Sequence, residues 1–246
     1  MSYYRISRTL ASIGHPTGAL WIALVLLSSL ACSPLRTYDT SAIVAQWEDD
    51  IREFERLDQA TVYPDSAILF AGSSSIRLWD DIEQDMAPYA VIQRGYGGAA
   101  LHDFAYYAPR ILYPHRYQAL VLFVGNDIWG NADDKSPEEM VRLFKHIVRQ
   151  SQRHQPAAPV FIVEVTHVPK REALVEEIQR ANDAIREATQ GWENVHFIPT
   201  SDLFLTADRT VRRGVFRDDD IHQNEAGYRR WTERLKEHIR RGLDAG

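Results

Sequence analysis

The sequence predicts an α/β protein in which helices cover both faces of a central, parallel, five-stranded sheet. Two observations carry this prediction. Short apolar runs alternate along the chain with longer segments whose apolar residues recur at helical spacing, and such alternation is typical of βαβ units. Several apolar runs also end abruptly in glycine-rich or polar turns, as parallel strands do where ligands bind at their carboxyl ends.

The elements follow one another in a single order, with no linker that would divide the folded part of the chain. Strands are expected at residues 67–70, 91–94, 119–124, 160–165 and 195–198. Helices are expected after 41, from 76, at 101–112, from 137, at 172–189 and after 224. Ser41, Ser136 and Asn224 are the expected caps of the first, fourth and last helices, because their side chains can accept orphan backbone N–H groups.

The N-terminal segment predicts an export signal. Arg5 and Arg8 precede a continuous apolar run at 19–27 that is too short to span a bilayer comfortably, and small residues follow before Cys32. Leu-Ala before Cys32 resembles a bacterial lipobox, in which that cysteine is lipidated, although Ser29 stands where leucine is usual. Ordinary cleavage before Cys32 and an uncleaved N-terminal anchor are the alternatives.

This interpretation divides the chain into three parts and places the folded part outside the cytoplasm, in the cell envelope. The parts are an export signal at 1–32, a tether at 33–40 and one domain at 41–246. The formal charge of −6 argues against nucleic acid as a partner. Because Cys32 is the chain's single cysteine, no intramolecular disulfide can form.

Four polar turns contain the residue types that acyl transfer needs. Ser74 follows the first strand in the run Gly-Ser-Ser-Ser, and a serine hydroxyl becomes a nucleophile when a base takes its proton. His222 is the candidate base, and Asp219 is the candidate partner for the other ring nitrogen. Gly97 and Gly98 lie in the second turn, and Asn126 lies in the third.

Each of these residues is common in turns by itself, and only their joint occurrence in this order is informative. The chain lacks the Gly-x-Ser-x-Gly elbow of α/β-hydrolases and the glycine pattern of dinucleotide-binding folds. The run at 218–220 offers oxygen atoms to a metal, but no other carboxylate cluster accompanies it. We therefore expect no metal and no cofactor.

The four blocks resemble the SGNH hydrolases, also called the GDSL esterase and lipase family, over most of the chain after residue 32. Two departures are Ser73 in place of the family's Asp and Val124 in place of a Gly. The resemblance implies a flavodoxin-like fold with Ser74 as nucleophile and Asp219 and His222 as its partners. It also implies an oxyanion hole made by the N–H groups of Ser74 and Gly98, with Gly97 as the close alternative to Gly98, and by the side chain of Asn126.

The expected function is therefore serine-dependent hydrolysis of a small-molecule ester, with the protein held at a membrane by its N-terminal lipid. Short acyl or acetyl esters, carried by carbohydrate or lipid, are the expected substrates. Trp79, Tyr96 and Trp129 adjoin the polar turns and are candidate substrate-binding residues. The alternatives are a thioesterase or lysophospholipase, and an inactive surface-anchored binding protein on the same scaffold.

Overall fold

A computed structural model describes residues 34–244, so the predicted export signal and Cys32 lie outside the described residues. The five strands form one sheet in the order β2-β1-β3-β4-β5, and every neighbouring pair is parallel. The strands are β1 (Ile68–Gly72), β2 (Val91–Gly95), β3 (Ala119–Phe123), β4 (Val160–Val163) and β5 (Val195–Ile198). The predicted fold class is confirmed.

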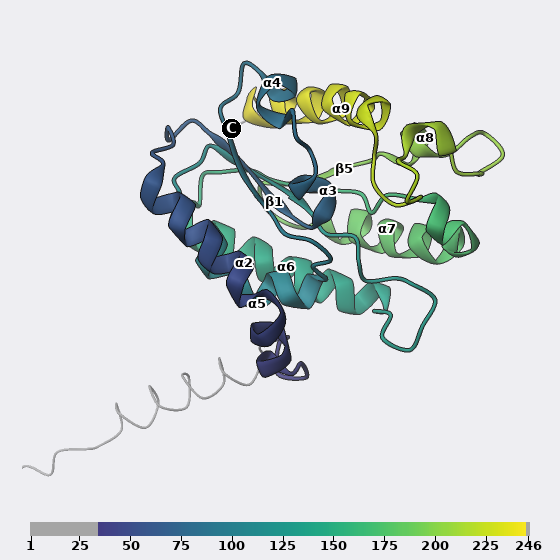
Figure 1. Cartoon of the computed structure of the whole chain (residues 1–246), viewed down its shortest axis with the longest axis horizontal. Coiled ribbons are helices and arrows are strands. Elements are labelled where there is room, and N and C mark those ends of the chain that lie inside the picture. The colour runs from purple at the N-terminus through teal and green to yellow at the C-terminus, as the bar shows by residue number, and fades with distance from the viewer. Residues whose placement is uncertain (1–33, 245–246) are drawn as a thin grey trace, which may run out of the picture. The chain divides into compact units, whose positions relative to one another are not determined.

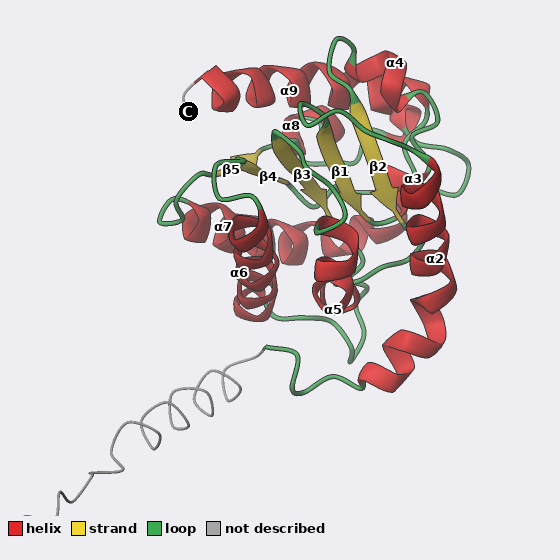
Figure 2. Cartoon of the chain, turned by 90° about the vertical axis from the view of Figure 1, so that its left-hand side faces the viewer, coloured by secondary structure: helices red, strands yellow, loops and turns green. Residues whose placement is uncertain are grey.

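The helices form a layer on each face of the sheet, as Figures 1 and 2 show. One layer contains α2 (Thr40–Ala60), α5 (Leu101–Leu112), α6 (Pro137–His154) and α7 (Val175–Thr189). The other contains α4 (Ile82–Met86), α8 (Ser201–Phe204) and α9 (Glu225–Asp244). The short α3 (Ser74–Arg77) directly follows β1, and the 3₁₀ helices η1 (Pro169–Leu174) and η2 (Arg213–Val215) lie in connections. None of the helices within residues 34–244 is long and apolar enough to cross a membrane.

Helix caps follow local sequence chemistry, with one exception. Ser136 Oγ accepts the N–H of Glu139 at the start of α6, and Asn224 Oδ1 accepts the N–H of Gly227 at the start of α9. The predicted cap of α2 was wrong, because Asp39 rather than Ser41 accepts the first free N–H groups and the helix begins at Thr40. A carboxylate at this position satisfies the same orphan donors that a serine would.

Several predicted boundaries also move, including those of three strands, β1, β2 and β3, by one or two residues. The helix expected from 76 already begins at Ser74 and ends at Arg77, and the helix expected at 172–189 is divided between η1 and α7. Strand β4 ends at Val163 rather than at 165. Beyond this end, the N–H and C=O of Val165 pair with the side-chain amide of Asn182 on α7, at 3.0 and 2.9 Å, instead of with a strand.

Candidate active site

The position of Ser74 is set by the close approach of β1 to the end of β3. Gly72 ends β1 with φ at +141°, and a Cβ there would lie 1.8 Å from the carbonyl oxygen of Phe123, so only glycine fits. The N–H of Ser73 then donates to that same oxygen at 2.9 Å. The chain turns at once into α3, whose first residue is Ser74. The hydroxyl therefore stands at the carboxyl edge of the sheet, as expected.

His222 lies on a short loop before α9 that is closed by its own hydrogen bonds. Phe216 and Gln223 pair across the loop as an antiparallel bridge, and the N–H of Arg217 donates to the carbonyl of His222 at 2.8 Å. Within the loop, Asp219 Oδ1 accepts the N–H groups of Ile221 and His222, both at 2.9 Å. The spacing Asp-x-x-His thus forms a turn that holds both side chains on the same side.

The three predicted side chains form one hydrogen-bonded chain. His222 Nε2 lies 2.9 Å from Ser74 Oγ, and His222 Nδ1 lies 2.7 Å from Asp219 Oδ2. An ionised carboxylate can only accept, so Nδ1 carries the ring proton and Nε2 is the acceptor for the serine hydroxyl. This is the geometry that a general base needs toward a nucleophile.

Asp219 keeps its charge in this arrangement. Partial burial alone would raise the pKa of its carboxyl, but hydrogen bonds from the His222 and Ile221 N–H groups and from the His222 ring more than offset this. Together they hold the pKa at about 2. The carboxylate is 44% exposed, whereas the His222 side chain is 18% exposed. The imidazole therefore lies in the less hydrated part of the site, with a permanent negative charge behind it.

Asn126 comes to the same site from the end of β3. It lines a small pocket, with a cavity volume of about 20 Å³, together with Ser74. Its Nδ2 donates to the carbonyl of Ala99 at 3.1 Å, which fixes the side-chain amide. Gly98 precedes Ala99 and has φ at +77°, a left-handed conformation that a side chain would strain. The two predicted contributors to the oxyanion hole are thus joined through Ala99.

Besides Ser73 and Ser75, which flank the nucleophile, two polar residues from the segment after β4 line this pocket and were not predicted. Thr166 follows β4, and Arg171 lies in η1. Both side chains are buried, at 3% and 5% exposure. Thr166 lies just past the carboxyl end of a parallel strand, so the rule that identified the other turns points to it as well. Arg171 belongs to no sequence motif. Its place in the pocket depends on the path of the connection after β4, which the sequence does not reveal.

Of the three predicted aromatic residues, only Trp129 adjoins this pocket. It is 37% exposed, lies over the guanidinium of Arg171 at 4.9 Å, and donates from Nε1 to the carbonyl of Asn126. Tyr96 is fully buried between Trp47 of α2 and Phe104 of α5. Its place in the core corrects the expectation that it contacts substrate, because adjacency to a turn does not set the side to which a ring points.

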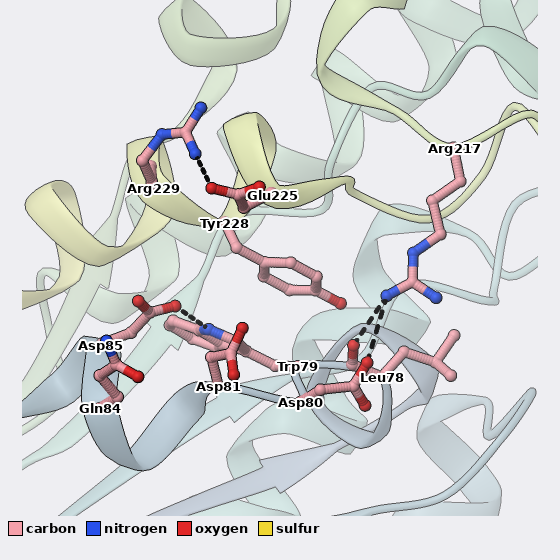
Figure 3. A pocket seen from close by; sticks show the side chains of 10 residues that line it. All are labelled: Leu78, Trp79, Asp80, Asp81, Gln84, Asp85, Arg217, Glu225, Tyr228 and Arg229. Carbon is pink, nitrogen blue, oxygen red and sulfur yellow. Dashed lines mark hydrogen bonds and ion pairs between the residues drawn. The ribbon is translucent and has the colours of Figure 1, made fainter.

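Trp79 is 1% exposed and belongs to the core between the sheet and α9, which corrects the same expectation. Its ring stacks on Tyr228, and its Nε1 donates to Asp85 at 2.6 Å. It forms part of a larger cavity of about 370 Å³ between the α3–α4 segment and α9, which is shown in Figure 3. There Arg217 reaches the carbonyl of Leu78. None of the three predicted catalytic side chains lines this cavity.

Within residues 34–244 no group of three or more histidine, cysteine, aspartate or glutamate side chains is arranged to hold a metal ion. The run at 218–220 shows why. Asp219 is engaged with His222, and Asp220 forms an ion pair with Arg213 at 3.4 Å. Two of the three charges of this run are therefore engaged by Arg213 and His222, while Asp218 is exposed.

Comparison with known proteins agrees with this fold and identifies the family. The protein is a hydrolase that acts on ester bonds. It belongs to the GDSL-like lipase/acylhydrolase family, whose sequence profile matches residues 65–230 and so spans all four polar turns. A search of curated proteins gave no match.

Solved structures similar to the chain share its fold at low sequence identity. A protein from Streptococcus pneumonia, provisionally named a platelet activating factor, is 19% identical with a TM-score of 0.70, over 91% of this chain and 100% of that one. A GDSL-like lipase from Bacteroides thetaiotaomicron is 15% identical with a TM-score of 0.65, over 78% and 97%. A carbohydrate esterase family 3 protein from Talaromyces cellulolyticus is 14% identical with a TM-score of 0.56, over 74% and 99%.

Proposed function

We propose that the protein is a serine esterase that forms an acyl-enzyme on Ser74. The observation that supports this most directly is the unbroken chain Ser74 Oγ, His222 Nε2, His222 Nδ1, Asp219 Oδ2, with separations of 2.9 and 2.7 Å. Nucleophile, base and orienting carboxylate are within hydrogen-bond distance before any substrate binds. Separately, none of the three would activate a serine.

In the first half-reaction, Ser74 Oγ bonds to the ester carbonyl carbon while His222 Nε2 takes the hydroxyl proton. The tetrahedral intermediate collapses, the carbon–oxygen bond to the alcohol breaks, and the alcohol leaves with the proton from His222. Water then attacks the acyl-enzyme in the same way, with His222 again as base, and the carboxylic acid is released. Asp219 stabilises the imidazolium at each transfer.

The negative oxygen of each tetrahedral intermediate needs donors already in place. We assign these to the side-chain amide of Asn126 and to the backbone N–H groups of Ser74 and Gly98. Ser74 is the first residue of α3, so its N–H has no carbonyl partner within the helix. The bond from Asn126 Nδ2 to Ala99 uses one of the two amide protons and leaves the other available.

The size of the pocket favours a short acyl group. The cavity beside Ser74 is only about 20 Å³, little more than the space of one water molecule, so a long acyl chain does not fit inside it. The similarity to a carbohydrate esterase family 3 structure supports a carbohydrate as the alcohol portion of the ester. We therefore propose removal of acetyl or similarly short acyl groups, with carbohydrate esters ahead of lipid esters.

Turnover of 4-nitrophenyl acetate, butyrate and octanoate by the full chain in detergent tests this function. We expect kcat/KM to fall with chain length, and Ser74→Ala to abolish turnover. Ser41→Ala, an exposed serine on α2, is the matched control and should keep full activity. Equal rates for Ser74→Ala and the unaltered chain would favour a binding protein, and a rate that rises toward octanoate would favour a lipase.

We also propose that the protein is exported and held at the cell envelope by a lipid on Cys32. The basic segment, the short apolar run and the Leu-Ala-Cys sequence support this. Metabolic labelling with palmitate followed by membrane fractionation is the test. Label and membrane association should both be lost in Cys32→Ala. Label retained in that variant would contradict lipidation at this residue.

A further inference from the structure

Arg171 is a buried cation in the wall of the pocket beside Ser74. Its Nη1 donates to the carbonyls of Gly125 at 2.6 Å and Ile128 at 3.1 Å, on either side of Asn126 and Asp127. The residue is 5% exposed, and the Trp129 ring covers one face of its guanidinium. One end of the guanidinium thus supports the turn that contains Asn126.

The other edge of the same guanidinium has no partner among residues 34–244. Nε is buried without a hydrogen bond, and among residues 34–244 no acceptor is bonded to Nη2 and no carboxylate forms an ion pair with the group. The N–H of Nε and one N–H of Nη2 are parallel, which is the fork that binds both oxygens of a carboxylate. A buried charge and a buried donor left in this state are both costly.

The two acidic side chains whose charges act on Arg171 are already engaged by backbone N–H groups. Asp127 accepts the N–H of Leu101 through both oxygens, at 3.0 and 3.2 Å. Asp134 accepts the N–H groups of Trp129 and Gly130, both at 2.7 Å. Their charges act on Arg171 at a distance, but neither carboxylate meets the fork. A negative group that does so has to come from outside the described residues.

Thr166 adds a second unmet polar atom to the same pocket. Its Oγ1 is buried, and no residue in the described part of the chain forms a hydrogen bond with it. Thr166, Arg171, Asn126 and Ser74 all line the cavity. A pocket meant only for an alkyl chain would place apolar side chains at these positions, because unpaired polar groups repel such a ligand. The polar wall therefore fits a ligand rich in acceptor oxygens.

We propose that Arg171 selects esters that carry a carboxylate close to the scissile bond. The inference rests on the proposed esterase activity and adds the charge of its substrate. The carboxylate accepts from the Nε–Nη2 edge and the Thr166 hydroxyl donates to it, while Ser74 attacks the ester carbonyl. Burial lowers the pKa of Arg171 to about 10, so the group is a cation at neutral pH, and an anion in the pocket offsets the burial.

The carboxylate can belong to either part of the ester, and two pairs of substrates separate these cases. Monobenzyl succinate against benzyl succinamate places the charge in the acyl part. O-acetyl-lactate against O-acetyl-lactamide places it in the alcohol part. In each pair the anion and its primary amide have nearly the same shape, so the ratio of their kcat/KM values reports the charge.

For the unaltered full chain we expect the anion to be preferred in one pair by about tenfold to a hundredfold, the range for one hydrogen bond to a charged group. Arg171→Met should bring that ratio to about one or below, and Arg171→Lys should restore part of it. Arg149→Gln, which removes an exposed charge on α6, is the matched control and should leave the ratio unchanged.

These measurements separate a selective role from a structural one. If Arg171 only supports the Asn126 turn, its variants lower turnover of both members of a pair by the same factor, and the ratio stays constant. A ratio near one in both pairs for the unaltered chain overturns the proposal even if the variants fail to fold. If the unaltered chain turns over none of these substrates, 4-nitrophenyl acetate included, the result counts against the esterase function itself.

Discussion

The carboxylate of Asp127 accepts the backbone N–H of Leu101 through both of its oxygens, at 3.0 and 3.2 Å, and so joins the turn after β3 to the first residue of α5. A second bond runs in parallel, from Asn126 Nδ2 to the carbonyl of Ala99. The Gly98 segment and the Asn126 turn therefore move as one unit. Asp127 is a positioning residue in this arrangement, because it connects the two turns through Leu101.

Asp127 also makes stability depend on pH. Burial raises the pKa of its carboxyl to about 7, against opposing effects of the Leu101 N–H and of Lys135, whose Nζ lies 3.9 Å away. The folded protein then binds a proton that the unfolded chain releases near pH 4, so the contribution of Asp127 to the free energy of unfolding falls as pH rises from about 4 to about 7. Asp127→Asn should remove that fall.

Thermal unfolding of both proteins, followed by circular dichroism between pH 4.5 and 8.5, checks this. The difference in Tm between Asp127→Asn and the unaltered chain should grow in favour of the variant as pH rises. Comparing the two chains cancels the contributions of all other titrating groups. A difference in Tm that stays constant across this range would show that Asp127 does not titrate there.

Asn126→Ala should lower kcat for 4-nitrophenyl acetate by about a hundredfold to a thousandfold, the usual cost of one oxyanion donor. The lost bond to Ala99 should cost only about 1 kcal/mol of stability. Stopped-flow measurement of kcat, with urea unfolding of the same preparation, separates the two effects. A tenfold or smaller change in kcat would exclude Asn126 from the oxyanion hole.

Asp219→Asn should lower kcat by about 10⁴, because an amide facing His222 Nδ1 favours the tautomer in which Nε2 is protonated and cannot act as base. The carboxyl of Asp219 has its pKa at about 2, so the negative charge is present throughout the usual assay range. The neighbouring and exposed Asp218 provides the control. Steady-state kinetics should show Asp218→Asn unchanged, and equal losses in both variants would point to a general effect of loop charge.

Gly98→Ala should destabilise the protein by about 1–2 kcal/mol, the cost of a side chain in the left-handed region. Its added Cβ would also lie 3.3 Å from Trp47 Cη2. The same change at Gly97 meets only the flexible end of Arg77 at 3.2 Å, and Gly97 does not have a positive φ. Urea unfolding should therefore give a lower free energy of unfolding for Gly98→Ala than for Gly97→Ala. The reverse order would contradict the left-handed conformation assigned to Gly98.

Much of the fold could be predicted from the sequence, because the apolar spacing that marks a strand or a helix lies within the segment itself. Helix α5 and strand β5 begin and end where predicted, and the caps of α6 and α9 are the residues expected. The boundaries that moved depend on distant partners. Strand β4 ends early because Asn182, on another element, takes the backbone groups of Val165. No local pattern contains that competition.

For the site, the sequence by itself determined the residue types. It placed Ser74 and Asn126 at strand ends and Asp219 and His222 in a polar turn before the last helix, which made these four residues candidates. Only the tertiary structure decided which side chains meet. It placed His222 at 2.9 Å from Ser74, buried Trp79 and Tyr96 in the core, and added Arg171 to the pocket. The physical reason is that side-chain direction within a turn is set by the elements packed around it, which come from distant parts of the chain.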